Sequence, residues 1–250
     1  MRRIEAMTKL LGRVVELVRY PVKSMAGVAS ESAFLGWHGL HGDRRFAFRR
    51  AGDKSGFPWL NASRVAELIL YQPCGLDERT DEPLPTHVRT PAGVERELWS
   101  EELQREVAER FGSEVELMQV RHGVFDDATI SIISTVTIAR VSRESGVAVD
   151  SRRFRANIVV ECDEGEAFLE ERWIGGTLVF GDDGPAVRVT MRDARCAMLN
   201  LDPKTAEPDP RVLRTVVRLN ENNAGVYGTV LQTGKISVGD KASLIVDGEL

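Results

Sequence analysis

One cysteine of the chain lies among arginines, a setting that can support metal or nucleophilic chemistry. Arg192 and Arg195 precede Cys196, so cationic side chains flank its thiol. Neighbouring cations favour the thiolate, the form that binds soft metals and attacks electrophilic substrates. Most single cysteines are instead buried small apolar residues, and Cys74 and Cys162, which lack such neighbours, fit that description. The local sequence leaves both interpretations open for Cys196.

Two segments near the amino terminus combine cations with hydroxyl or carboxylate groups. In YPVKS, Lys23 and Ser24 place an ammonium beside a hydroxyl, which suits a phosphate oxygen. For this pentapeptide alone, a solvated turn is the simpler interpretation. In GLHGDRRF, Asp43 precedes Arg44 and can orient its guanidinium for a bidentate hold on phosphate. Both segments are therefore candidates for binding an anion.

A third segment, FRANIVV, carries Arg155 and Asn157 two positions apart. A strand over 154–161 would project both side chains to one face, while Ile158 and Val160 pack on the other. That face would offer a guanidinium and an amide to a ligand. An arginine at a strand end followed by an asparagine in a turn is an equally simple interpretation.

The composition is ordinary for a soluble globular protein. The 250 residues can bury the core of one large domain or two small ones, and 42% are hydrophobic and 28% charged. With 33 basic and 38 acidic residues the net charge is −5, which argues against a general nucleic-acid binder. No apolar run approaches the roughly 18 to 20 residues of a membrane span.

The cysteines and the amino terminus bear on the compartment. Three cysteines without a CxxC pair argue against a disulfide framework or a structural zinc site. The stretch MRRIEAMTKLLGRVVELV has no apolar core or cleavage site typical of a signal peptide, and translation could begin at Met1 or Met7. We expect a cytoplasmic protein that contacts neither membrane nor nucleic acid.

Short β-branched and aromatic runs between turn residues predict a mixed, β-rich fold built on a compact β-barrel or sandwich. The expected strands are 14–18, 27–35, 45–48, 65–71, 115–120, 154–161, 177–180 and 187–191, with a hairpin across 232–234 and a final strand after it. Helices are expected over 98–112, capped by Ser100 and stopped by Gly112, over 134–146, and from Asp209-Pro210 onward. The stretch 73–93 is predicted to be a loop. A boundary between two units is expected near 120–130.

Taken in order, these segments resemble the MOSC domain, the C-terminal module of molybdenum cofactor sulfurases, preceded by its usual N-terminal β-barrel partner. YPVKS and GLHGDRRF match the barrel partner. The MOSC unit is matched by FRANIVV, the W-x-G-G-x-L-x-F-G stretch from Trp173, DARC, LDPKT, and the GVYG…G-x-I-x-V-G-D tail. The likeness runs from about Val14 to Val246. It implies a β-barrel MOSC core over 123–250 with short peripheral helices, and a smaller N-terminal β-barrel-like unit over 12–122.

The resemblance also implies a cofactor and its ligands. The cofactor would be the molybdopterin form of the molybdenum cofactor, with Cys196 as molybdenum ligand and catalytic residue. The phosphate and pterin contacts would come from Lys23, Ser24, Arg44, Arg155 and Asn157, with Arg64 on the same anion-binding face. Two positions depart from the family pattern, because Ala156 replaces a proline and Ala206 a glycine. Both changes touch loop geometry near the site.

The implied activity follows from relatives such as the mitochondrial amidoxime-reducing component and bacterial MOSC reductases, which reduce N-hydroxylated bases, amidoximes and N-oxides. We expect two-electron removal of oxygen from an N–O bond of a small molecule, with the cofactor carrying the redox chemistry. The chain has no flavin fingerprint, haem motif or iron–sulfur cysteine run, so the electrons are expected from a separate flavin or iron–sulfur protein.

Three alternatives remain. The protein could be a cofactor carrier or sulfur-transfer protein without reductase activity, in which Cys196 holds a persulfide or anchors the cofactor. Pyridoxal phosphate could form a Schiff base with Lys23, although the sequence offers no identifiable partner for the pyridinium nitrogen. A metal-free barrel could serve only as an interaction domain.

Overall fold

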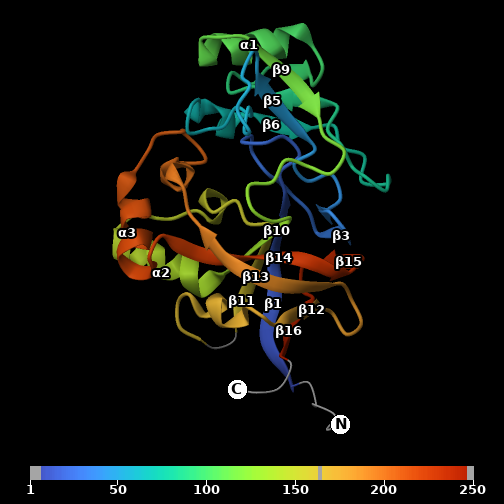
Figure 1. Cartoon of the computed structure of the whole chain (residues 1–250), viewed down its shortest axis with the longest axis vertical. Coiled ribbons are helices and arrows are strands. Elements are labelled where there is room, and N and C mark those ends of the chain that lie inside the picture. The colour runs from blue at the N-terminus through green and yellow to red at the C-terminus, as the bar shows by residue number, and fades with distance from the viewer. Residues whose placement is uncertain (1–6, 163–164, 247–250) are drawn as a thin grey trace.

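A closed β-barrel forms the core of the computed structural model, which describes residues 7–162 and 165–246. An eight-stranded sheet closes because its second-last strand, β1, also pairs with its first strand, β11, which leaves β2 attached outside the ring. Around the barrel the strands are β1 (Met7–Arg19), β11 (Ile158–Cys162), β10 (Ile130–Ser134), β14 (Asn223–Gln232), β13 (Ala186–Ala194), β12 (Thr177–Phe180) and β16 (Lys241–Val246). The barrel occupies the lower half of Figure 1.

The long strand β1 bends so that it can pair on both sides. Its register shifts between Leu10 and Gly12 against β16, and between Val14 and Glu16 against β11. Such irregularities increase local bending and twist. Gly12 has φ +152°, and a Cβ there would lie 1.9 Å from the Glu161 carbonyl oxygen, so only glycine fits this close approach. The barrel interior is filled by aliphatic and aromatic side chains, among them Val14, Ile132 and Phe180.

A second unit lies above the barrel (Figure 1). It contains β5 (Phe46–Arg50) paired with β9 (Val115–Gln119), and a small sheet of β6 (Gln72–Cys74), β7 (His87–Arg89) and β8 (Glu95–Glu97). Helix α1 (Glu101–Phe111) begins where the Leu103 amide donates to Ser100 Oγ and ends at left-handed Gly112. The core of this unit also takes in Leu201 and Ala206 from the carboxyl-terminal half, which joins the two units.

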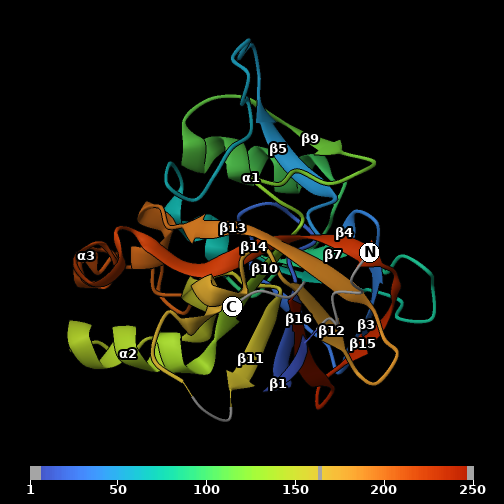
Figure 2. The ribbon, with the colours of Figure 1, turned by 60° about the horizontal axis from the view of Figure 1, so that its bottom comes forward.

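Helices α2 (Thr135–Ser145) and α3 (Pro210–Asn220) pack against each other on one flank of the barrel (Figure 2). Ser134 accepts from the Thr137 amide at the start of α2, and Asp209 accepts from the Arg211 amide at the start of α3. A further small sheet consists of β15 (Gly234–Ser237), β3 (Ser32–Gly36) and β4 (Gly39–Leu40), and the outer strand β2 is Val28–Ala29.

The structure confirms the mixed, β-rich fold with a barrel core and short helices, but four local predictions are wrong. Residues Ala66–Leu70 form a 3₁₀ helix rather than a strand, because their buried side chains Leu68 and Ile69 are adjacent rather than alternate. The predicted loop 73–93 contains β7 and most of β6. No hairpin forms across 232–234, since β15 pairs with β3 instead of β14. The strand predicted over 154–161 begins only at Ile158.

The first strand of the barrel comes from the part of the chain predicted to belong to the amino-terminal unit. Strand β1 pairs with β11 and β16, and the segment between β1 and β10 supplies the second unit. The division into 12–122 and 123–250 stays a prediction, and its last four residues, like the possible start at Met1, lie outside the described residues. Within the described ranges, no helix is both long and apolar enough to cross a bilayer.

Candidate functional site

A pocket of about 310 Å³ gathers five of the seven predicted site residues. Its walls come from the turn after β1, the Gly42–Phe46 turn, the segment before β11, and the loop after β13. The five predicted residues that line it are Lys23, Ser24, Arg44, Arg155 and Cys196. Residues that are far apart in the sequence thus surround one cavity, as expected for a ligand site.

The pocket is richer in positive charge than the chain as a whole. Its lining includes five cations, Lys23, Arg44, Arg153, Arg155 and Arg195, against three carboxylates, Asp126, Asp127 and Asp193. The chain carries a net charge of −5, so this local excess is not a general property of the surface. It favours an anionic ligand.

Arg44 is held in place by carboxylate and amide groups behind the pocket. Its guanidinium forms an ion pair with buried Asp43 and donates to Asn157 Oδ1 at 3.4 Å and to the Arg155 carbonyl at 3.3 Å. Burial would lower the pKa of Arg44, but the Asp43 carboxylate outweighs that effect and raises it. The arrangement expected from GLHGDRRF, an aspartate that orients an arginine, is present.

Asn157 supports the site from behind and does not line the pocket. It is 1% exposed, donates to the Val18 carbonyl and to Asp43 Oδ2 at 3.1 Å each, and accepts from the Ser131 amide at 3.2 Å. It therefore fixes the Asp43–Arg44 pair rather than facing a ligand in this structure. Its contact with a pterin stays a prediction.

Arg155 offers a charge that no carboxylate of the described chain contacts directly, although Asp43 and Asp126 stabilise it from farther away. Its Nη1 donates to the Met25 carbonyl at 2.8 Å, and among the described residues it has no ion-pair partner. Burial lowers the pKa of Arg155 to about 10, with nearby Arg44 acting in the same direction and the Tyr20 hydroxyl opposing. A buried guanidinium that has no ion-pair partner is stabilised when an anion binds beside it.

Three lining residues that can donate to a ligand share an unusual backbone conformation. Ser24, Arg44 and Arg155 have φ of +67°, +49° and +52°, in the left-handed region that residues with a side chain seldom adopt. Arg155 is consequently not on a strand, and the prediction that Arg155 and Asn157 share a strand face is wrong. Strained backbone of this kind persists where the surrounding structure fixes it, and it is frequent at ligand sites.

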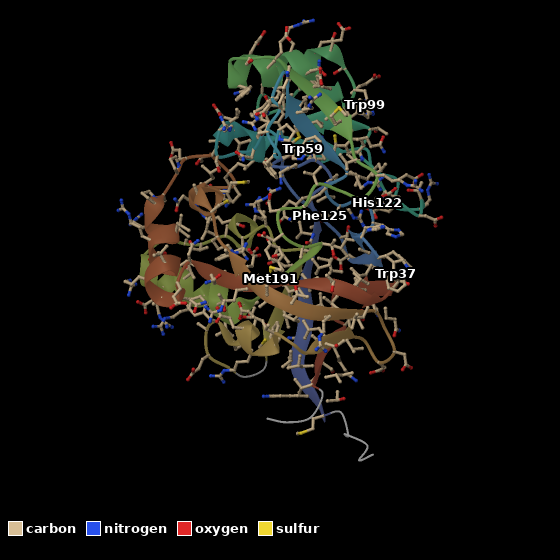
Figure 3. All side chains as sticks on the ribbon, in the orientation of Figure 1. Trp37, Trp59, Trp99, His122, Phe125 and Met191 are labelled. Atoms are coloured by element: carbon tan, nitrogen blue, oxygen red, sulfur yellow. The ribbon has the colours of Figure 1, made fainter. Side chains whose placement is uncertain are left out.

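Lys23 is 8% exposed and pairs with Asp126, which also lines the pocket, with 2.8 Å between Nζ and Oδ1. Burial lowers the pKa of Lys23, while Asp126 partly restores it. The centre of the Phe57 ring lies 5.1 Å from Nζ. Phe125, next to Asp126, appears between the two units in Figure 3, and its ring lies 5.8 Å from the Arg44 guanidinium.

Cys196 is exposed and lies just before a 3₁₀ helix at Ala197–Asn200. Its neighbouring arginines have other partners. Arg195 pairs with Asp193 at 2.8 Å and donates to the Phe154 and Ala224 carbonyls, and Arg192 pairs with Glu171 and Glu221. The thiol is accessible from the pocket, and the nearby guanidinium charge of Arg195 is shared with these internal partners.

Sequence reasoning missed a buried polar group on the barrel side of the pocket. Asp193, 1% exposed, accepts from Ser131 Oγ at 2.6 Å and bonds to the side chain of Tyr227. Burial raises the pKa of Asp193, although Arg195 opposes this. The available signal was a serine within the apolar run ISIIS, because a buried hydroxyl needs a polar partner. Arg64, by contrast, is exposed and does not line the pocket, whereas its neighbour Ser63 does.

Comparison with known proteins identifies the family. The MOSC domain model matches residues 119–243, half of the chain, and the model of the MOSC N-terminal beta barrel domain matches residues 11–56. The molybdenum cofactor sulfurase of Drosophila mojavensis is 24% identical over 263 aligned residues, which cover 88% of this chain and 32% of that protein. The chain thus spans about a third of the length of this curated relative.

Two solved structures show some similarity to the chain, one over nearly its whole length and one over about half. The YuaD protein from Bacillus subtilis is 15% identical, with 97% of this chain and 98% of that one covered and a TM-score of 0.48. YiiM from Geobacillus stearothermophilus is 19% identical over 46% of this chain and 53% of its own, with a TM-score of 0.36. On the strength of the family models, the chain belongs to the MOSC domain family, which is associated with molybdenum cofactor binding.

Proposed function

We propose that this protein is a molybdenum-cofactor-dependent oxidoreductase that reduces N–O bonds of small N-hydroxylated compounds. The observation that carries the proposal is the single pocket that unites an exposed thiol, Cys196, with the unpaired guanidinium of Arg155. A soft sulfur ligand and a site for an anion are the two features that a metal–pterin phosphate requires.

The residues present fit such a group. Cys196 would bind the metal, and Lys23, Ser24, Arg44 and Arg155 would receive the phosphate, because all line the pocket and carry donors. When bound, the cofactor supplies the two-electron chemistry that cleaves the N–O bond. The protein contributes position and charge.

The pocket also contains ionisable side chains that can supply protons for the reaction. Reduction of an N-hydroxylated base to the free base and water consumes two electrons and two protons. The Lys23 ammonium, whose pKa burial lowers, lies 2.8 Å from Asp126, so this pair can hold and release a proton inside the pocket. The Phe57 ring lies beside the ammonium, which the surrounding residues leave only slightly exposed. In our proposal the electrons come from a separate flavin or iron–sulfur protein.

Metal and pterin analysis tests the proposal. The full chain is expressed in a host that makes the cofactor, and molybdenum and pterin are measured per protein. Reduction of benzamidoxime is then followed with reduced methyl viologen as artificial donor. We expect near-stoichiometric molybdenum and turnover in the wild type. Cys196→Ala should abolish turnover and lower the molybdenum content, while Cys74→Ala, at a cysteine that does not line the pocket, should retain both.

Each outcome has a clear meaning. Wild-type turnover in Cys196→Ala would refute the role of that thiol. Bound cofactor without turnover of benzamidoxime would favour a carrier or sulfur-transfer protein. Wild-type protein without molybdenum or pterin would overturn the proposal altogether.

A further inference from the structure

A second pocket, of about 780 Å³, shares no lining residue with the candidate site, the pocket of about 310 Å³ that is lined by Cys196 and is called the Cys196 pocket below. It lies among β3, β15 and the loop around Glu78 and Pro83. Its lining contains two cations, Arg19 and Lys235, three carboxylates, Glu31, Glu78 and Asp81, and the aromatic surface of Phe34. The proposed function makes no use of this pocket.

Arg19 is a buried cation whose carboxylate partner is accessible to solvent. Only 2% of the Arg19 side chain is exposed, whereas Glu78 is 52% exposed. The two form a bidentate pair, with Nη1 to Oε1 at 2.6 Å and Nη2 to Oε2 at 3.1 Å. Burying a guanidinium is costly unless an anion binds it. Arg19 therefore requires a carboxylate-like group, and the accessible Glu78 side chain fills that position.

The loop that carries Glu78 has no regular secondary structure, so its hold on Arg19 is not imposed by a helix or strand. Residues 75–86 connect β6 to β7, and Arg79, next to Glu78, has a side chain 90% exposed. The Nε of Arg19 and the hydroxyl of Ser30 are both buried without a hydrogen-bond partner. Two polar groups at this pocket therefore remain without a hydrogen-bond partner while Arg19 is paired with Glu78.

Of the remaining walls, Phe34 offers an aromatic face and Lys235 a cation, while Glu31 and Asp81 add two carboxylates. Phe34 is 45% exposed and packs against the His41 ring, with 4.7 Å between ring centroids. Lys235 has no ion-pair partner within the described ranges, so its ammonium is available at the pocket. An aryl carboxylate combines a ring that can pack on Phe34 with a charge that complements the cations Arg19 and Lys235.

We propose that this pocket binds a small aryl carboxylate, whose carboxylate takes the place of Glu78 on Arg19. Binding is a simple exchange of one carboxylate for another on the same guanidinium, so it creates no unpaired buried charge. Glu78 then acts as a built-in competitor that lowers the affinity of the pocket. Its exposed position allows it to leave for solvent.

Calorimetric titration with benzoate, in buffer free of other carboxylates, tests the proposal on the full chain. Benzamide serves as the uncharged analogue. Glu78→Gln removes the competing charge and should tighten benzoate binding at least about fivefold. Glu95→Gln, which alters an exposed pair with Arg89 elsewhere, and Arg155→Ala, in the Cys196 pocket, should leave benzoate affinity unchanged.

A loss-of-binding variant completes the test. Lys235→Gln, on an accessible strand position, should weaken benzoate binding in both the wild-type and the Glu78→Gln backgrounds. Arg19→Met should abolish it, and if that variant does not fold, the Lys235→Gln result stands in its place. The proposal is overturned if Glu78→Gln binds benzoate no more tightly than the wild type, or if benzamide binds as well as benzoate. Neither outcome depends on the molybdenum cofactor.

Discussion

The Arg155 guanidinium lies 4.2 Å from the centre of the Tyr20 ring, so the unpaired cation of the Cys196 pocket rests on an aromatic face. Arg44 lies 5.2 Å from the same ring. One buried tyrosine thus supports two of the cations that would receive an anion. Such contacts contribute about 0.5 to 2 kcal/mol each, more when they are shielded from water.

Replacement of Tyr20 should separate the role of the ring from that of the hydroxyl. Tyr20→Phe keeps the aromatic face and should change the free energy of unfolding by about 1 kcal/mol or less. Tyr20→Leu removes the face and leaves a cavity, and should destabilise by about 2 to 4 kcal/mol. Urea unfolding of both variants provides the measurement. Equal losses would show that the ring does not support the arginines.

The alkaline titration of the protein should be displaced from that of free tyrosine. All three tyrosines have a raised pKa, principally through burial, and that of Tyr20 is about 12. Absorbance at 295 nm should therefore show no phenol that ionises near pH 10 while the protein is folded. Because the folded state holds these protons more tightly, the three tyrosines contribute to the free energy of unfolding. This contribution is fully present below pH 10 and falls as the pH rises towards 12. Phenolate formation near pH 10 in the folded protein would contradict the burial.

Asp126 should control the ionisation of Lys23. Burial lowers the pKa of Lys23 and Asp126 opposes it, so Asp126→Asn should lower the pKa further. The charged, buried Lys23 then destabilises the folded state at any pH below its folded pKa. This destabilisation disappears once the pH exceeds the pKa of a free lysine, because Lys23 is then neutral in both the folded and the unfolded state. NMR titration of the Lys23 side chain measures the shift, and Asp127→Asn in the same pocket is the control. An equal shift in both variants would argue against the specific pair.

Ala206 provides a test of a position where this chain departs from its family. The family usually has glycine there, and the structure gives Ala206 a φ of +61°, which explains that preference. Ala206→Gly relieves about 1 kcal/mol or more of backbone strain but removes a buried methyl worth about 0.8 kcal/mol, so stability should change by less than about 1 kcal/mol. Ala224→Gly, fully buried on β14, should cost about 1 to 2 kcal/mol. Thermal unfolding of the two variants gives the comparison.

The sequence predicts well those features that have local causes. The caps at Ser100, Ser134 and Asp209 mark the starts of all three α-helices of the described chain, because a side-chain oxygen satisfies an amide only a few residues away. The orientation of Arg44 by Asp43 is likewise a neighbour effect.

Features that depend on distant partners could not be predicted in the same way. The pairing of β15 with β3 and the left-handed backbone of Arg155 are set by tertiary packing, so no local pattern signals them. The buried Asp193–Ser131 pair joins residues from two separate strands, so the serine in ISIIS signals a buried hydroxyl but does not identify its partner. Five of the site residues found from motifs nonetheless line one pocket and Asn157 supports it from behind, while Arg64, chosen with the least local support, does not line it.

The closure of the barrel by β1 and β16 has a consequence for synthesis of the protein. Thr8 pairs with Ile245, so one side of β1 stays unpaired until almost the whole described chain has left the ribosome. The second unit, whose strands and helix α1 lie between these two strands in sequence, can gather most of its contacts earlier. Contacts of such high sequence separation form slowly, and an unpaired strand edge invites misassembly. We therefore expect nascent chains to depend on chaperone protection of β1 during translation.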